Sequence, residues 1–317
     1  MSRIENNIHF IWIGTDIPDD RLNVLLLWLG RTGTYSFYLW TDPHRTEEYA
    51  RRVAELCKTS ELIASRATLQ IRARDVGHTL VIENHRHAQT YLHVLAYTTL
   101  PALNDPALLY EEIYTWRNYG AASDFLRIWA LHQKGGVYLD LDTYPGSGAL
   151  RPNLSAPRDI LFARTSSAGK KMLTNAIIAC SARNPALLDL SASIDWSYEE
   201  EFPTASFGTR EVTDAHWKRF AEAESRREMM RSGKYKLLAK NALGYVMGNP
   251  TINRSGPGKI REWIGQREGS PVDEWLDSPV DPNVQPRLYS EWTESLYCFQ
   301  DQTGYDPIIL SKQSWVQ

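Results

Sequence analysis

Short apolar runs alternate with polar loops and amphipathic segments along the first part of the chain. Residues 8–14, "IHFIWIG", form a β-branched and aromatic run that ends at a glycine, and residues 35–42 form a second run of this kind. Between them, a segment with helical spacing begins after Asp19 or Asp20. The order strand, helix, strand predicts a parallel β-α-β unit and hence an α/β fold.

The next part of the chain is more polar. Residues 44–66 are charged and have helical spacing, residues 67–76 form a candidate strand, and residues 85–100 have the pattern of another helix. We therefore expect one domain over residues 1–317, with a mainly helical insertion at about 44–115.

The clearest amphipathic helix spans residues 118–136 and stops at a pair of glycines. The apolar run that follows it, residues 137–144, contains two acidic residues, Asp140 and Asp142. Successive side chains of a strand point to opposite faces, so residues two apart point to the same side. The pattern therefore predicts two carboxylates that project together at the end of a strand, where ligands bind in parallel α/β sheets.

Carboxylates inside an apolar run are unfavourable unless a cation or another partner compensates them. Oxygen ligands in this number suit Mg²⁺ or Mn²⁺, which bind one or two carboxylates together with phosphate oxygens of a substrate. The pair Asp140 and Asp142 therefore indicates a site for a metal diphosphate. The alternative is a solvated pair on an edge strand, because D-x-D triplets are common by chance.

A second charged pair lies on the preceding helix. Asp124 and Arg127 are three residues apart and share one helix face. Placed just before the D-x-D strand, they can bracket a hydroxylated ligand that carries phosphate. The alternative is an ordinary surface ion pair.

Composition narrows the range of functions. The 317 residues are 43% hydrophobic and 23% charged, which is the composition of a globular protein. The formal net charge is -3, so the chain lacks the excess of basic residues that a nucleic-acid partner requires. Three cysteines fit neither a disulfide framework nor a zinc cluster and suggest a reducing compartment. The sequence shows neither a membrane-spanning run nor a secretory signal peptide. We expect a protein that is cytoplasmic in its producer or delivered into a target cell by another route.

The string "AASDFLRIWALHQKGGVYLDLD", with "HFIWIG" about 110 residues upstream, resembles the core of GT-A glycosyltransferases, which carry a metal-binding D-x-D motif. The sequence is most similar to the glucosyltransferase domains of large clostridial toxins and to the arginine N-acetylglucosaminyltransferase effectors of enteric pathogens. The similarity covers residues 8–14, 36–42 and 118–185, and the C-terminal tail loosely. It implies a Rossmann-like nucleotide-sugar-binding core with helical insertions and a C-terminal lid at about 306–317.

The resemblance also implies roles for individual residues. Trp12 packs on the uracil or ribose of a UDP-sugar, or else is a core indole. Asp142 is the direct metal ligand, and a serine and a tryptophan of the tail complete the metal shell and cover the donor. Ser311 competes with Ser314 for that place, and the alternative for the whole tail is a frayed terminus. The implied donor-binding residues are Trp12, Asp124, Arg127, Tyr138, Asp140, Asn175, Ser314 and Trp315. The implied metal ligands are Asp140, Asp142 and Ser314, and the implied catalytic residues are Asp140, Asp142 and Arg127.

One departure concerns the acceptor. The arginine-modifying effectors have a histidine and a Glu-Asn pair after the D-x-D motif. Here Asn175 is present, but Thr174 stands in place of the glutamate, and residues 143–175 contain no histidine. Arginine as the acceptor is therefore in doubt, and the sequence does not indicate retention or inversion at the anomeric carbon.

The sequence thus predicts an enzyme that uses Mn²⁺ or Mg²⁺ to move glucose or N-acetylglucosamine from a UDP-sugar to an acceptor. We expect the acceptor to be a protein side chain, in a toxin or effector role. A bacterial glycan or a small molecule is the alternative acceptor. A sugar-nucleotide-binding protein without turnover and a metal-dependent phosphohydrolase are the alternative functions, although no further Asp or His ligands of a phosphohydrolase cluster near residue 140.

Overall fold

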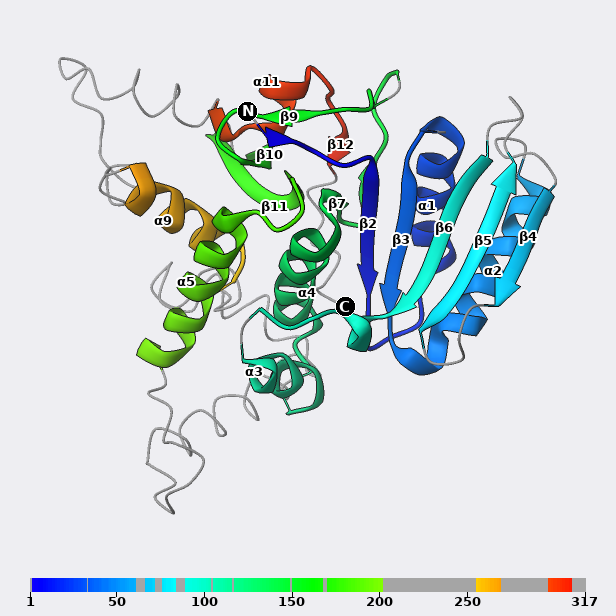
Figure 1. Ribbon diagram of the computed structural model, residues 1–317, viewed down its shortest axis with the longest axis horizontal. Helices are drawn as coiled ribbons and strands as arrows, with labels where there is room; N and C mark the ends of the chain where they lie inside the picture. Colours follow the sequence, from blue (N-terminus) through cyan, green and yellow to red (C-terminus); the bar gives the residue numbers. More distant parts are fainter. Residues whose placement is uncertain are drawn as a thin grey trace.

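The computed structural model places one large sheet between two layers of helices (Figure 1). It describes residues 2–32, 34–60, 66–71, 76–83, 89–103, 105–115, 117–148, 150–167, 170–201, 255–268 and 296–309. Within these residues no helix is long and apolar enough to cross a membrane. The predicted α/β fold class is confirmed.

Eight strands of the described residues form the main sheet. Across the sheet their order is β10 (Ile160–Ser167), β11 (Lys170–Cys180), β7 (Gly136–Leu139), β2 (Asn7–Trp12), β3 (Ser36–Thr41), β6 (Gln89–Ala96), β5 (Gly77–Glu83) and β4 (Arg66–Ile71). The four central strands β7, β2, β3 and β6 are parallel, and the outer strands pair antiparallel. The carboxyl ends of the four central strands therefore meet at one edge, the usual ligand-binding edge of such a sheet.

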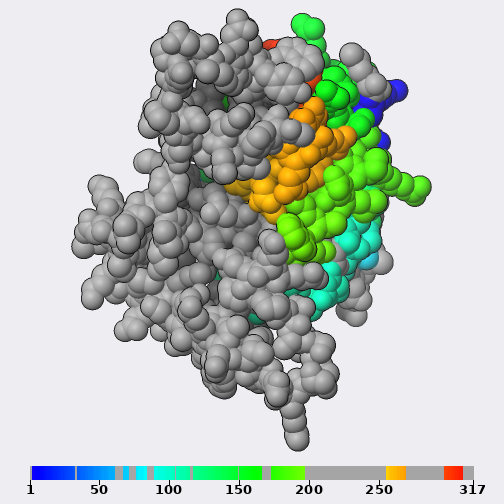
Figure 2. Space-filling view, turned by 90° about the vertical axis from the view of Figure 1, so that its left-hand side faces the viewer, coloured from blue at the N-terminus to red at the C-terminus, as the bar shows by residue number. Residues whose placement is uncertain are grey.

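The helices divide between the two faces of the sheet. Their bounds are α1 (Asp19–Arg31), α2 (Thr46–Thr59), α3 (Pro106–Tyr110), α4 (Tyr119–Lys134), α5 (Pro185–Glu201), α9 (Pro257–Glu268) and α11 (Phe299–Thr303). Figure 1 shows α1 and α2 on one face and α4 on the other. Helix α5 packs against α4, and α9 lies beside α5 at the surface (Figure 2).

Shorter elements connect these layers. They are β1 (Ser2–Arg3), β8 (Thr143–Tyr144), β9 (Ser155–Ala156), β12 (Ile308–Ile309), the 3₁₀ turns η1 (Pro43–Arg45) and η2 (Tyr97–Thr99), and the π-helical turn η3 (Glu111–Thr115). Strand β12 pairs antiparallel with β8, and β1 pairs antiparallel with β9. The C-terminal β12 therefore lies beside the segment that follows the D-x-D motif.

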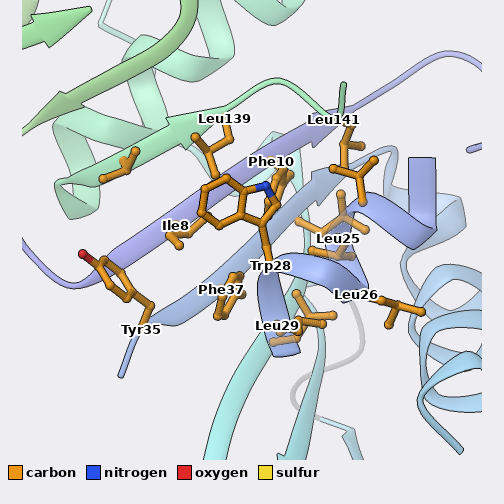
Figure 3. Close-up of a cluster of buried hydrophobic side chains, with 14 of the residues drawn as sticks. Ile8, Phe10, Leu25, Leu26, Trp28, Leu29, Tyr35, Phe37, Leu139 and Leu141 are labelled. Carbon is orange, nitrogen blue, oxygen red and sulfur yellow. The ribbon is translucent and has the colours of Figure 1, made fainter. Parts of the chain in front are cut away.

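The face covered by α1 and α2 is apolar. The Trp28 indole lies among side chains of β2, β3 and β7, which include Ile8, Phe37 and Leu139 (Figure 3). All of these side chains are at most 1% exposed. The indole N–H donates a hydrogen bond of 2.7 Å to the Thr143 carbonyl, so this aromatic core residue also holds backbone beyond the D-x-D motif.

On the α4 face, a histidine lies buried in β2. The indole N–H of Trp40 donates to Nδ1 of His9 at 3.2 Å, so Nε2 carries the proton and donates to the Gly135 carbonyl at 2.8 Å. Burial lowers the pKa of His9 to about 4, because a charged imidazole loses its hydration there. This histidine is thus a neutral structural link between β2, β3 and the end of α4.

Most of the predicted elements are present, with one clear exception. The predictions at 8–14, 35–42 and 118–136 correspond to β2, β3 and α4, and α1 begins at Asp19, just before its predicted start. The helix predicted at 85–100 is wrong, because residues Gln89–Ala96 form β6. Leu92 and Val94 point into the core while Tyr91 is 41% exposed, an alternation of period two that a strand satisfies. The segment predicted as a mainly helical insertion thus contributes three strands to the sheet.

Candidate functional site

The candidate site lies at the carboxyl edge of the parallel strands. Asp42 follows β3 and accepts a hydrogen bond of 2.7 Å from the backbone N–H of Gly14, which follows β2. Gly14 has φ 82°, and a Cβ atom there would lie 2.1 Å from the Tyr119 ring at the start of α4. Only glycine permits both this backbone conformation and this close packing. The loop after β2 is therefore fixed between β3 and α4.

The D-x-D motif forms a turn at this edge. Strand β7 ends at Leu139, and the next backbone N–H, of Asp140, donates to the Ala176 carbonyl at 2.9 Å. The chain then turns, and the N–H of Thr143 donates back to the Asp140 carbonyl at 2.9 Å. The prediction that Asp140 and Asp142 both lie in a strand is therefore wrong. Their predicted position at the carboxyl end of a buried strand is correct.

The two carboxylates of the motif differ in their surroundings. The Asp142 residue is 5% exposed, whereas the Asp140 side chain is 25% exposed. The Tyr138 hydroxyl donates to Oδ1 of Asp140 at 2.5 Å, and Nη1 of Arg127 lies 3.5 Å from the same oxygen. Burial raises the pKa of Asp140, while Arg127 and the Tyr138 hydroxyl oppose that rise. Asp140 is thus held by protein groups on the α4 side.

Arg127 stands at the centre of a buried polar network. Its Nη1 donates to the Asn175 carbonyl at 2.7 Å, and its Nη2 donates to the Ser123 hydroxyl at 2.5 Å. Nη2 also lies 3.0 Å from Oδ1 of Asp124, and the guanidinium stacks 4.5 Å above the centre of the Tyr138 ring. The alternative of a surface ion pair is wrong, because the Arg127 and Asp124 side chains are only 6% and 5% exposed. The Arg127 guanidinium thus contacts residues of three elements, α4, β7 and β11.

Asp124 is the most completely enclosed carboxylate of this network. Its Oδ1 accepts from the Asn175 side-chain amide at 2.7 Å, and its Oδ2 accepts from the Ser255 hydroxyl at 2.8 Å. Burial raises the pKa of Asp124 to about 6, and Arg127 opposes that rise. The carboxylate therefore has a partner on each oxygen, as a buried charge requires.

The network includes two serines that the sequence prediction missed. Ser255 belongs to the Gly- and Pro-rich loop before α9, 131 residues from Asp124, and no local pattern links the two. Ser123 had a detectable signal, since it lies four residues before Arg127 on the same helix face.

The other predicted residues are only partly brought to this network. Trp12 ends β2 at the same sheet edge, but its ring packs on the apolar cluster of the α1 face and its N–H donates to the Thr15 carbonyl at 2.8 Å. It therefore has some of the character of a core indole. Ser311, Ser314 and Trp315 lie outside the described residues.

The donor set of the D-x-D turn fits a hard divalent cation. Carboxylate oxygens suit Mg²⁺ or Mn²⁺, which need only one or two of them when phosphate oxygens fill the remaining positions. Among the residues that the structure describes, no group of three or more His, Cys, Asp or Glu side chains could hold a metal. This part of the chain thus lacks the full protein cage of a zinc site or of many metal-dependent hydrolases, and Asp142 and Asp140 fit a cation shared with a diphosphate.

Comparisons with known proteins match the part of the chain that contains the D-x-D motif. The family of the glycosyltransferase sugar-binding region containing the DXD motif matches residues 43–152. The chain is 25% identical over 197 residues to subversion of eukaryotic traffic protein A of Legionella pneumophila, covering 62% of this chain and 26% of that protein. It is 24% identical over 210 residues to Cytotoxin-L of Paraclostridium sordellii, covering 49% of this chain and 9% of the toxin. It thus spans about a quarter or less of these relatives.

A solved structure shares the fold. The catalytic domain of alpha-toxin from Clostridium novyi superposes with a TM-score of 0.51 at 16% identity, covering 92% of this chain and 80% of that one. Together with the family match over residues 43–152, this confirms the predicted resemblance to D-x-D glycosyltransferases and the predicted fold class.

Proposed function

We propose that the protein transfers glucose or N-acetylglucosamine from a UDP-sugar to an acceptor, with Mn²⁺ or Mg²⁺ bound at the D-x-D turn. The observation that carries this proposal is the position of the turn. Asp140 and Asp142 follow β7 directly at the carboxyl edge of the parallel strands, beside the buried network of Arg127. This is the edge where nucleotides bind in open α/β sheets.

The two aspartates have different roles in this proposal. Asp142 is the main protein ligand of the cation, and Asp140 supplies a second oxygen while its Oδ1 stays bound to Tyr138. When bound, the cation stabilises the negative charge that develops on the departing diphosphate. The Tyr138 hydroxyl and the Arg127 guanidinium fix the orientation of Asp140 before the donor arrives.

In this proposal the buried network borders the donor sugar. Asp124 is 4% exposed and Asn175 is 7% exposed, and both lie on the α4 side of the sheet, as Asp140 does. Arg127 already binds Asp124, Ser123 and the Asn175 backbone, so its main contribution is to hold these groups in place. Such preorganisation lowers the reorganisation that the reaction would otherwise require.

For the acceptor we propose a protein of a target cell. The names of two relatives support this: one is a cytotoxin and the other subverts traffic in eukaryotic cells. A bacterial glycan or a small molecule is the competing acceptor, and a panel of candidate acceptors would distinguish them.

Release of UDP tests the reaction itself. We expect one UDP-sugar of a panel to release UDP with Mn²⁺ and not with a chelator, and Asp142→Asn to lose this release. Asp20→Asn is the matched control, because Asp20 is exposed at the start of α1. If the protein binds a UDP-sugar but releases no UDP, even when extracts that contain candidate acceptors are added, it is a sugar-nucleotide-binding protein. This outcome would contradict the proposed transferase.

A further inference from the structure

The segment directly after the D-x-D turn, residues Thr143–Gly146, is held by α1. The Trp28 indole N–H donates to the Thr143 carbonyl at 2.7 Å. One turn later on the same helix, Nη1 of Arg31 donates to the carbonyl of Gly146 at 2.9 Å and to that of Pro145 at 3.3 Å. Both ends of this four-residue segment are therefore attached to α1.

The C-terminal part of the chain holds the same segment from another side. Strand β12 pairs with β8, with Ile309 opposite Thr143. The backbone N–H of Gly146 donates to the Tyr305 hydroxyl at 2.9 Å in a buried position. The Tyr305 ring lies 6.0 Å from the Trp28 ring. A Cβ atom at residue 146 would lie 2.0 Å from the Asp306 carbonyl oxygen, so glycine is required for this contact.

The C-terminal segment is itself attached to the main sheet. Asp301 of α11 forms a two-pronged ion pair with Arg164 of β10, at 2.6 and 2.8 Å. The Gln300 side chain binds both the backbone N–H and the carbonyl of Arg164, at 2.9 and 2.7 Å. The helix α11 that precedes Tyr305 is therefore anchored to β10 of the main sheet.

We propose that Trp28, Arg31 and Tyr305 are positioning residues that set the D-x-D turn for its divalent cation. The inference rests on the proposed function, because it assumes that the turn binds the cation. Asp142 is joined directly to Thr143, whose carbonyl Trp28 fixes, so a shift of this segment moves the Asp142 carboxylate. Magnesium-type cations require nearly ideal octahedral geometry, and groups that orient metal ligands affect affinity strongly.

Tyr305→Phe is the sharpest test, because it removes one hydroxyl and keeps the ring beside Trp28. It leaves the buried N–H of Gly146 without this partner, which favours a displaced segment. We expect the affinity for Mn²⁺, titrated by electron paramagnetic resonance with and without UDP, to fall about 10-fold, the lower end of the range for groups that orient ligands. Trp28→Phe, which removes the indole N–H, should act in the same direction.

Tyr297→Phe is the matched control. Tyr297 is also a buried tyrosine of the C-terminal part, but its hydroxyl donates to Glu268 of α9 at 2.7 Å. Its Mn²⁺ affinity should equal that of the unmodified protein. Equal affinity in Tyr305→Phe, or equal losses in both tyrosine variants, would overturn the positioning role while the proposed function stands. Absence of Mn²⁺ binding by the unmodified protein would overturn the metal-binding premise and this inference together.

Discussion

The two faces of β7 show two different ways of holding a structure together. Val137 and Leu139 belong to the apolar cluster that contains Trp28 of α1, and Figure 3 shows Leu139 beside the Trp28 indole. Tyr138 and the following Asp140 point toward α4 and enter the polar network of Arg127. The first face depends on volume and apolar contact, and the second depends on complete pairing of charges and hydrogen bonds.

This difference predicts how each face responds to substitution. A shortened side chain on the apolar face leaves a cavity, and the cost follows the size of that cavity. A deleted group on the polar face leaves buried partners without a bond, and the cost follows their charge. Only the polar face should also change donor turnover strongly.

The largest effect is expected for Arg127→Met. The substitution leaves Asp124 and Asp140 without their shared cation and should cost about 3–5 kcal/mol of unfolding free energy. Donor turnover should fall by on the order of 100-fold, because the carboxylates lose their fixed positions. Arg51→Met is the control, since Arg51 pairs with Glu47 on the exposed side of α2 and should cost less than about 1 kcal/mol. Similar losses in urea denaturation for both variants would contradict the account.

Leu139→Ala tests the apolar face of the same strand. Leu139 is 1% exposed, and its truncation should cost about 2–5 kcal/mol in urea denaturation. Leu188→Ala, at a residue 46% exposed on α5, should cost about 0.5 kcal/mol or less. Below its melting temperature, Leu139→Ala should keep most of its donor turnover. A turnover loss as large as that of Arg127→Met would remove the distinction between the faces.

The buried His9 should make stability depend on pH. Its pKa falls from the usual 6.5 to about 4 on folding, so the unfolded chain binds the proton more readily. Stability is therefore lost as pH falls from about 6.5 to about 4, by about 3 kcal/mol in total. His9→Gln should remove this contribution from urea titrations over that range, and the exposed His44→Gln should keep it. If the free energy of unfolding depends on pH in the same way for His9→Gln and the unmodified protein, His9 is not the source of this pH dependence.

The smallest effect is expected for Ser255→Ala. Asp124 loses one of its hydrogen bonds, which should cost about 1–2 kcal/mol and raise the KM for the donor more than it lowers kcat. Ser255→Thr keeps the hydroxyl and should restore most of both. If Ser255→Ala and Ser255→Thr behave alike, the hydroxyl of Ser255 has no role in the site.

Local patterns in the sequence predicted the elements that local physics determines. The β-branched and aromatic runs of β2 and β3, the helical spacing of α4 and the acidic triplet were enough to locate the sheet edge and the D-x-D motif. The spacing of Asp124 and Arg127 also predicted that they would share a helix face, and they do form an ion pair.

The features that were missed depend on contacts between distant residues. The hydrogen bond from Ser255 to Asp124 joins residues 131 apart, and that from Trp28 to Thr143 joins residues 115 apart. Strand β6 was taken for a helix because apolar residues stand on both of its faces: Leu92 and Val94 are buried, whereas Tyr91 is exposed, so the alternation is masked. The turn of the D-x-D motif follows from pairing with β11, which the acidic triplet itself does not encode.

The central claim is that the D-x-D turn binds a divalent cation together with the diphosphate of the donor. Calorimetric titration of UDP, with Mn²⁺ and then with a chelator, tests it most directly, because it requires neither the correct sugar nor an acceptor. The account predicts tight binding of UDP only with Mn²⁺, lost in Asp142→Asn and kept in Asp20→Asn. Binding of UDP that is equally strong without the metal, or unchanged in Asp142→Asn, would contradict it.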